Sequence, residues 1–363
     1  MRIVMTYHYF WPHRGGIENT AGGLAREFVK LGHEVTVITS DIGEGGAKRP
    51  AHEKVEGIDV IRLPGIHLPG RILALRGLWK TLKGTEGDVW HAHHPSPFVA
   101  DRFIFQCKKR HLPTVLSYHA DAADEGMVDS LLASGYYRTL GNRMLSSANE
   151  IMVHSKSYME TSPWLLPHRK KVSIIPAGIR PEEFSHADSK KFRRLFKLKE
   201  KKVVCSLGRL VPYKGYEYLI RALPLLGKDW VFLLGGSGPE ESRLKKLALD
   251  LGLKDSVIFA GRINEAEKKD FYAAADVFCL PSISRGEAFG VSILEAMAVG
   301  RPAVVSDIPG PRDIKGAITV RPRSPEALAK AITDADGIRA KLDPEYDIRN
   351  AAKKVLGVYE RLL

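Results

Sequence analysis

The stretch VVCSLGRLVPYKGYEYLIRALPLLGKDWVFLLGG, residues 203–236, contains one complete structural unit. Its first five residues, VVCSL, form a short apolar run typical of a buried strand, and WVFLL near its end forms another. Between them, residues 214–225 carry apolar side chains at helical spacing. The order strand, helix, strand predicts two parallel strands joined by a crossover helix.

The same alternation continues on both sides of this stretch. The first half of the chain has expected strands at residues 2–6, 34–40, 58–63, 88–91, 114–118, 150–153 and 171–175, and expected helices at 17–31, 71–83, 96–110 and 127–147. The second half adds strands at 256–261, 277–282 and 302–307 and helices at 240–251, 266–275 and 290–299. A polar connector, residues 176–202, separates the halves. We therefore predict an α/β protein of two Rossmann-like domains, 1–178 and 179–343, facing across a cleft.

The composition is that of a globular protein with two domains. The chain has 363 residues, of which 44% are hydrophobic and 27% charged. Its three cysteines, Cys107, Cys205 and Cys279, lie far apart and lack metal-ligand spacing, so we expect free thiols in a reducing, cytoplasmic compartment. No apolar run reaches the length of about 18 residues that a membrane span needs, and the first residues read as a strand, not a signal peptide.

The formal net charge of +13 favours polyanionic partners. Nucleic acid, an anionic membrane surface and phosphate-bearing substrates all fit this charge, as does a basic surface with no partner. Because no nucleic-acid recognition motif occurs in the chain, we expect no nucleic-acid partner.

Two carboxylates stand close together in RGEAFGVSILE, residues 285–295. The flanking glycines predict that Glu287 lies in a loop and that Glu295 lies on the second turn of a helix beginning near Gly290. Backbone N–H groups at the start of that helix would point into the same space, where the helix dipole favours an anion. This order matches a nucleotide sugar, which has hydroxyls on both sides of a diphosphate. The alternative is a core salt bridge for Glu295 and a solvated Glu287.

Two cations follow the strand at 203–207. Arg209 offers a planar fork and Lys214 a point charge, and both suit a diphosphate. The alternative is a surface turn with solvated cations. Gly236, in the glycine-rich turn after the next strand, is by itself a weak signal for phosphate binding.

Several segments together resemble a known family. EAFGVSILE resembles the E-x7-E signature of the retaining glycosyltransferases of family 4, which have the GT-B fold. SLGRLVPYKG, GGSGPE, IIPAGIRPEEF and AVGRPAVVSDIPG stand where that family has its other signature segments, although Ala177 replaces a usual asparagine. In the first half, HRGGIENTAGGLAREFVKLGHEVTVITS, DVWHAHHP and VLSYHAD are similar to its glycine loop and later strand ends. The resemblance covers nearly the whole chain and implies that the last helix, 344–363, returns to the first domain.

The resemblance also implies roles for individual residues. Glu295 would hold the ribose hydroxyls and Glu287 the hydroxyls of the donor sugar. Arg209 and Lys214 would neutralise the diphosphate as it departs, and His119 would lie beside the donor sugar and the acceptor as a catalytic residue. Further implied substrate contacts are Gly15 and Gly16 in the first-domain loop, Gly236, Arg262 and Ile263 at the base, and Phe289, Gly290 and Val291 around the sugar and phosphates.

The implied reaction is a retaining sugar transfer from a UDP- or GDP-sugar, without a metal or other cofactor, because two cations take the place of magnesium. A nucleotide-sugar 2-epimerase of the same fold is the alternative. A dinucleotide-dependent oxidoreductase is nearly excluded, since the aromatic loop TYHYFWPHRGG follows the first strand where GxGxxG would be required. The base, the sugar and the acceptor stay open. A membrane lipid, a lipid-linked or free glycan and a small molecule are all compatible acceptors, and the aromatic loop is our candidate for contacting one.

Residues 71–83, RILALRGLWKTLK, run from Arg71 to Lys83 as an expected basic amphipathic helix with Trp79. Such a helix suits an anionic membrane surface, and family members that work at membranes use a basic helix here. The alternative is a helix that packs its leucines on the sheet with its cations in water. The run His91, His93, His94 also raises the question of a metal, but without a second cluster of ligands we expect structural hydrogen bonds instead.

Overall fold

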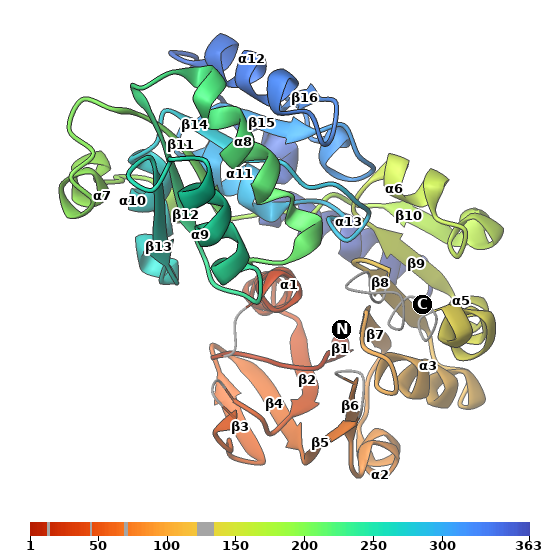
Figure 1. Cartoon of the computed structure of the whole chain (residues 1–363). Coiled ribbons are helices and arrows are strands. Elements are labelled where there is room, and N and C mark those ends of the chain that lie inside the picture. The colour runs from red at the N-terminus through yellow and green to blue at the C-terminus, as the bar shows by residue number, and fades with distance from the viewer. Residues whose placement is uncertain (13–14, 44–45, 69–71, 122–133) are drawn as a thin grey trace. The chain divides into compact units, whose positions relative to one another are not determined.

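A computed structural model describes residues 1–12, 15–43, 46–68, 72–121 and 134–363 (Figure 1). The chain forms two compact units, Met1–Gly178 with Ile348–Leu363, and Ile179–Asp347. They are called unit 1 and unit 2 below. Each unit contains its own largely parallel sheet covered by helices, so the predicted α/β class with two Rossmann-like domains is confirmed.

Unit 1 is built on an eight-stranded sheet with the strand order β10-β9-β8-β7-β1-β2-β4-β3. All neighbouring strands are parallel except the antiparallel edge pair of β3 and β4. The strands are β1 Arg2–Thr6, β2 Glu34–Ser40, β3 His52–Val55, β4 Ile58–Leu63, β7 Val89–His94, β8 Thr114–Tyr118, β9 Glu150–Val153 and β10 Val172–Ile174. The α-helices are α1 Gly16–Lys30, α2 Leu78–Gly84, α3 Ala100–Lys109, α5 Asn142–Ser147, α6 Lys156–Thr161 and α13 Ile348–Glu360.

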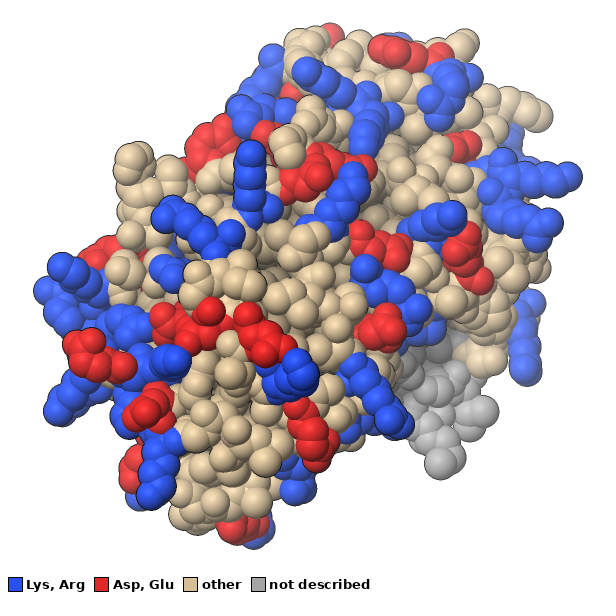
Figure 2. All heavy atoms as spheres, turned by 90° about the horizontal axis from the view of Figure 1, so that it is seen from above, with Lys and Arg blue, Asp and Glu red and all other residues tan. Residues whose placement is uncertain are grey.

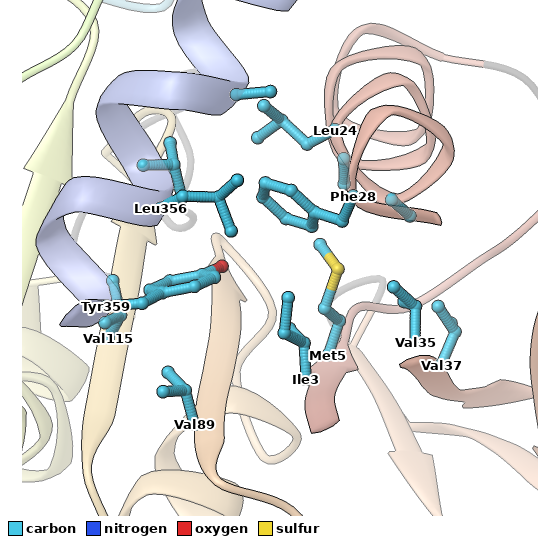
Figure 3. Close-up of a cluster of buried hydrophobic side chains, with 14 of the residues drawn as sticks. Ile3, Met5, Leu24, Phe28, Val35, Val37, Val89, Val115, Leu356 and Tyr359 are labelled. Carbon is cyan, nitrogen blue, oxygen red and sulfur yellow. The ribbon is translucent and has the colours of Figure 1, made fainter. Parts of the chain in front are cut away.

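The last helix belongs to the core of unit 1. Helix α13 packs beside α1 on one face of the sheet, where Leu356 and Tyr359 meet Phe28 over strands β1 and β7 (Figure 3). Phe28 and Tyr359 are both fully buried, and their ring centroids lie 5.6 Å apart. Burial of each aromatic side chain of this size stabilises the folded state by about 2 kcal/mol. The C-terminal segment is therefore a structural part of unit 1.

Unit 2 is built on a six-stranded parallel sheet with the strand order β13-β12-β11-β14-β15-β16. The strands are β11 Lys202–Leu207, β12 Trp230–Gly235, β13 Val257–Gly261, β14 Val277–Leu280, β15 Ala303–Ser306 and β16 Ile318–Val320. The helices are α7 Ser189–Leu195, α8 Tyr216–Leu226, α9 Glu241–Asp250, α10 Lys268–Ala273, α11 Val291–Ala298 and α12 Pro325–Ala335. The central strands are buried along their length, which explains why they read as continuous apolar runs.

The expected helix at residues 71–83 is wrong. Ile72–Leu75 is a strand, β6, which pairs antiparallel with β5 Gly65–Leu68, and only Leu78–Gly84 is helical. Gly77 separates the two elements, because its φ of +85° is a left-handed conformation that ends the strand and precedes the helix. Arg71 lies outside the described residues. A short apolar run such as ILAL fits a strand or a helix equally well, so periodicity could not decide between them.

The cysteines, the apolar character of the helices and the surface charges bear on the other expectations. All three cysteines are buried and unpaired. Across the described ranges, we find no helix with the length and apolar character needed to cross a bilayer. Lysine and arginine side chains are spread over the face seen in Figure 2 and alternate with acidic ones.

Candidate functional site

Four loops of unit 2 meet at the carboxyl edge of its sheet. They follow β11, β12, β13 and β14, which are neighbours in the sheet, and comprise residues 208–215, 236–240, 262–267 and 281–290. We call these loops, together with the helices α10 and α11 that follow two of them, the strand-end cluster. In open parallel sheets, ligands bind outside the carboxyl ends of the strands, so this edge is the place to look for a site.

Glu287 and Lys214 form a buried ion pair within the strand-end cluster. Lys214 Nζ lies 2.5 Å from Glu287 Oε2, and their side chains are only 11% and 10% exposed. Ser282 Oγ donates a second hydrogen bond to the same carboxylate oxygen at 3.1 Å. Burial alone would lower the pKa of Lys214, but the Glu287 carboxylate and two nearby tyrosines raise it above its ordinary value. Lys214 is therefore charged at neutral pH, and Glu287 is not solvated.

Glu295 forms a second buried polar group on the second turn of α11. Its Oε1 pairs with Lys268 Nζ at 3.1 Å, and its Oε2 accepts a hydrogen bond from Tyr272 Oη at 2.6 Å. Lys268 and Tyr272 both lie on α10, and Lys268 also pairs with Glu265 at 2.9 Å. Glu295 thus makes the core salt bridge that the sequence left as an alternative. The carboxylate is held in one orientation, as a ligand-binding group also requires.

Two glycines allow the strand-end cluster to close tightly. Gly236 has a φ of +122°, and a Cβ there would lie 1.9 Å from the carbonyl oxygen of Gly208. Gly290 caps the start of α11 with a φ of +93°. Any other residue would be strained at either position. The first N–H groups of α11 have no partner within the helix, so its N-terminus is suited to an anion.

The other unit 2 residues that were expected at the site differ in exposure. Arg209 and Arg262 are exposed, and Ile263 is partly buried beside Gly235. Val291 is half-buried at the start of α11. Phe289 is buried against Tyr346, with ring centroids 6.3 Å apart, so its side chain supports the loop and only its backbone can face a ligand.

In unit 1, the glycine loop leads into α1. Gly15 caps this helix in an extended conformation, and Gly16 is its first residue. A Cβ at Gly16 would meet no atom of the described residues within 4 Å. Internal packing therefore does not require a glycine at this position, which is consistent with a backbone approached by a ligand.

His119 lies in a chain of hydrogen bonds along the carboxyl edge of the unit 1 sheet. Its Nε2 is 2.8 Å from His93 Nδ1, and its Nδ1 is 2.9 Å from His154 Nε2. His154 Nδ1 in turn donates to the carbonyl oxygen of Ile175 at 3.0 Å. Burial, followed by the neighbouring imidazoles, lowers the pKa of His119 and His93 far below the ordinary value, so both rings are neutral.

The other histidines of strand β7 are also held by hydrogen bonds. His91 contacts Tyr359 Oη at 2.6 Å and Ser117 Oγ at 2.8 Å, and His94 Nε2 contacts Tyr137 Oη at 2.7 Å. Within the described part of the chain, no three His, Cys, Asp or Glu side chains are arranged to hold a metal ion.

Four residues that these sites depend on were not expected from the sequence. Lys268 and Tyr272 orient Glu295, Ser282 contacts Glu287, and His154 contacts His119. For His154 a signal existed, because it follows an expected strand as His119 does. The other three are ordinary residues of a helix and a loop, and only the packing reveals them.

Comparison with known proteins identifies the family. Residues 188–353 match the family described as "Glycosyl transferases group 1", and residues 14–183 match "Glycosyltransferase Family 4". An uncharacterized glycosyltransferase of Methanocaldococcus jannaschii is 32% identical over 99% of this chain and 94% of its own length. The chain belongs to glycosyltransferase family 4. As a member of this family it is a glycosyltransferase.

Further similarities extend over almost the whole chain. A GDP-mannose-dependent alpha-(1-6)-phosphatidylinositol monomannoside mannosyltransferase of Mycobacterium tuberculosis is 27% identical over 92% of this glycosyltransferase and 88% of its own length. Among solved structures, a sucrose-phosphate synthase of Thermosynechococcus elongatus has a TM-score of 0.74 at 20% identity, covering 99% of this chain and 98% of its own. An Anabaena protein solved with UDP and glucose has a TM-score of 0.73 at 18% identity, with coverage of 99% and 100%. The GT-B fold is therefore confirmed, and none of these comparisons supports an epimerase.

Proposed function

We propose that this glycosyltransferase transfers a sugar from a nucleoside-diphosphate sugar with retention of the anomeric configuration. The observation that carries the proposal is the strand-end cluster, in which two oriented carboxylates lie near a helix N-terminus at the carboxyl edge of the sheet. The carboxylates suit hydroxyls on both sides of a diphosphate, and the N-terminus of α11 suits the diphosphate itself. GDP-mannose is the donor to test first, because several relatives are named as mannosyltransferases and some as GDP-mannose-dependent.

In this proposal, each residue acts on a stated part of the donor. Glu295 accepts hydrogen bonds from the ribose hydroxyls, and Glu287 accepts them from hydroxyls of the sugar. Arg209 and Lys214 stabilise the negative charge that develops when the bond between the sugar carbon and the phosphate oxygen breaks. Gly236, Gly290 and Val291 let the backbone approach the phosphates, with Phe289 supporting that loop from behind. Following the roles that the family resemblance implies, Gly15 and Gly16 also contact the phosphates, and Arg262 and Ile263 contact the base.

In this proposal, the Lys214–Glu287 pair also fixes the positions of two site residues before the donor binds. The Glu287 carboxylate keeps Lys214 charged, and the ion pair holds both side chains in place, so neither has to be reoriented during the reaction. Because Arg209, Lys214 and the helix N-terminus supply positive potential, the reaction needs no divalent metal.

Ligand-dependent stability tests the donor site. GDP or UDP at a hundred times its dissociation constant, with EDTA present, should stabilise the protein by about 2.7 kcal/mol. Glu295→Gln keeps a partner for Tyr272 but removes the charge, and it should reduce this gain strongly. Asp334→Asn removes a surface ion pair with Lys330 on α12 and should leave the gain unchanged. If neither nucleotide stabilises the protein, the donor site is wrong.

Product analysis tests the reaction. With donor and a suitable acceptor, the anomeric proton coupling of the product should show the same configuration as the donor sugar. An inverted product would refute retention. A donor epimerised at C2 without any acceptor would instead support the 2-epimerase.

We also propose that the acceptor is a membrane lipid or lipid-linked glycan, reached through a basic aromatic surface on unit 1. Trp79 on α2 is 45% exposed, and the ammonium groups of Lys83 and Lys109 lie 5.1 and 5.5 Å from its ring centroid. Leu78 and Leu82 are buried, so α2 presents its tryptophan and cations outward. An exposed tryptophan beside cations suits the interface of an anionic bilayer.

Vesicle binding tests this surface. The protein should sediment with phosphatidylcholine vesicles containing phosphatidylinositol more than with phosphatidylcholine alone, and added salt should weaken binding. Lys83→Gln with Trp79→Ala should reduce this binding, whereas Lys330→Gln on α12 should not. Equal binding to both vesicle types would refute the proposal that this surface binds an anionic membrane.

A further inference from the structure

The histidines at the carboxyl edge of the unit 1 sheet form a directed chain. Ile175 follows β10, His154 follows β9, His119 follows β8, and His93 lies near the end of β7. These four strands are consecutive neighbours in the sheet. The chain of hydrogen bonds therefore crosses the edge strand by strand, with each residue contacting the next. We call it the histidine relay.

The direction in which hydrogen bonds are donated along the relay follows from the bond between His154 and Ile175. The carbonyl oxygen of Ile175 can only accept a hydrogen bond, so His154 Nδ1 carries the proton that donates to it. In a neutral ring the other nitrogen is then unprotonated, so His154 Nε2 accepts a hydrogen bond from His119 Nδ1. By the same reasoning His119 Nε2 accepts from His93 Nδ1. A reversed chain would place two acceptors against each other, either His154 Nε2 against His119 Nδ1 or His154 Nδ1 against the carbonyl oxygen of Ile175.

The far end of the relay agrees with this direction. Because His93 Nδ1 donates in this direction, its Nε2 is unprotonated. This nitrogen is buried and has no hydrogen-bond partner within the described residues, and a protonated nitrogen there would be a buried donor without an acceptor. Stacking supports the arrangement, since the rings of His93 and His119 lie 5.2 Å apart and nearly parallel at 19°. The ring of His119 is thus bonded at both nitrogens and has none left to take a proton.

We propose that His154 is a positioning residue that keeps the His119 imidazole neutral and in its Nδ1-protonated form. This inference rests on the proposed function, with His119 in the place that the family resemblance implies for it, beside the donor sugar. As the diphosphate leaves, positive charge develops on that sugar, and an imidazolium beside it would repel the charge. A ring held neutral by the relay avoids this repulsion and does not act as an acid or a base.

Two substitutions of His154 distinguish its hydrogen bond to His119 from a role in packing alone. The amide of glutamine reaches about as far as Nε2, so His154→Gln can still accept from His119. The amide of asparagine reaches about as far as Nδ1, so His154→Asn keeps the contact to Ile175 but leaves His119 Nδ1 without its acceptor. His168→Asn serves as a control, because His168 also lies in unit 1 and contacts Asn142 instead of the relay.

The test has a spectroscopic readout and a kinetic one. In the full-length protein with ¹⁵N-labelled histidine and no ligand, long-range ¹⁵N–¹H spectra at pH 7 should show His119 and His154 neutral and protonated at Nδ1. His154→Asn should shift the His119 nitrogen signals and lower kcat about tenfold, the cost of roughly one hydrogen bond, with little change in the donor KM. His154→Gln and His168→Asn should remain close to the native protein in both readouts.

The outcomes are distinguishable from those for the proposed function. A His119 protonated at Nε2, or cationic, overturns the relay whatever the protein catalyses. The expected spectra with an unchanged kcat in His154→Asn overturn the positioning role. Failure of the proposed function would appear instead as a native protein that transfers no sugar, while the spectra still report the relay.

Discussion

The strand-end cluster of unit 2 and the histidine relay of unit 1 occupy the same edge of their sheets but handle buried polar groups differently. In unit 2 the groups are charged, and each carboxylate is paired with a lysine from another element. In unit 1 the groups are neutral imidazoles joined by hydrogen bonds. The comparison shows that one fold can hold buried polar groups in place either through ion pairs or through hydrogen bonds between neutral rings. The two sites should therefore respond differently to pH and to mutation.

Acid should distinguish the two regions most strongly. Burial, the largest cause, lowers the pKa of His91 and of His94 to about 3, and it also lowers the pKa of His93, His119 and His154. The unfolded chain takes up these protons near pH 6.5 and the folded chain does not, so stability is lost as pH falls below 6.5. Each histidine contributes about 1.4 kcal/mol per pH unit. Urea unfolding at pH 7, 6 and 5 should show a loss of several kcal/mol, and a flat profile would contradict neutral burial.

Breaking the charged pair should be the next largest effect. Lys214→Met leaves the Glu287 carboxylate buried without its cation and should destabilise the protein by about 3–5 kcal/mol. The double variant Lys214→Met with Glu287→Gln should cost less than the sum of the single changes. Thermal unfolding of the four proteins measures the coupling, and additive losses would mean that the pair is not a unit.

Arg209 should affect catalysis without affecting stability. Its side chain is exposed, so water screens the contacts that it makes, and Arg209→Gln should change the melting temperature little. In the proposed function it should lower kcat/KM by about a hundredfold, the size expected when one group stabilising a transition-state charge is removed. Arg221→Gln on α8, also exposed, is the matched control for initial rates. Equal rates in both variants would remove Arg209 from the site.

The smallest effect should come from Tyr272. Tyr272→Phe removes one hydrogen bond to the Glu295 carboxylate and should cost about 1.5–3 kcal/mol of stability. Nucleotide binding should weaken as well if Glu295 contacts the ribose. Calorimetric titration with GDP or UDP measures this, with Tyr218→Phe as control. Loss of stability with unchanged binding would leave Glu295 a purely structural residue.

Local patterns predicted some parts of the molecule better than others. Strands β11, β12, β14 and β15 of unit 2 were readable because they are buried on both faces and carry nearly continuous apolar side chains, whereas the short, half-exposed strand β16 was not expected. Residues 71–83 were misread because ILAL suits a strand as well as a helix, and only pairing with β5 makes it a strand. Glu287 and Glu295 could be selected from spacing and resemblance, but their partners Lys214 and Lys268 could not be assigned.

The sequence by itself determined the alternation of strands and helices, the family and the positions of the two carboxylates, because these depend on local periodicity and short motifs. Tertiary structure alone decided that Lys214 pairs with Glu287, that Lys268 and Tyr272 orient Glu295, and that His154 contacts His119. The reason is physical. A buried polar group must find a partner, and that partner is set by which strand ends lie side by side in the sheet, not by distance along the chain.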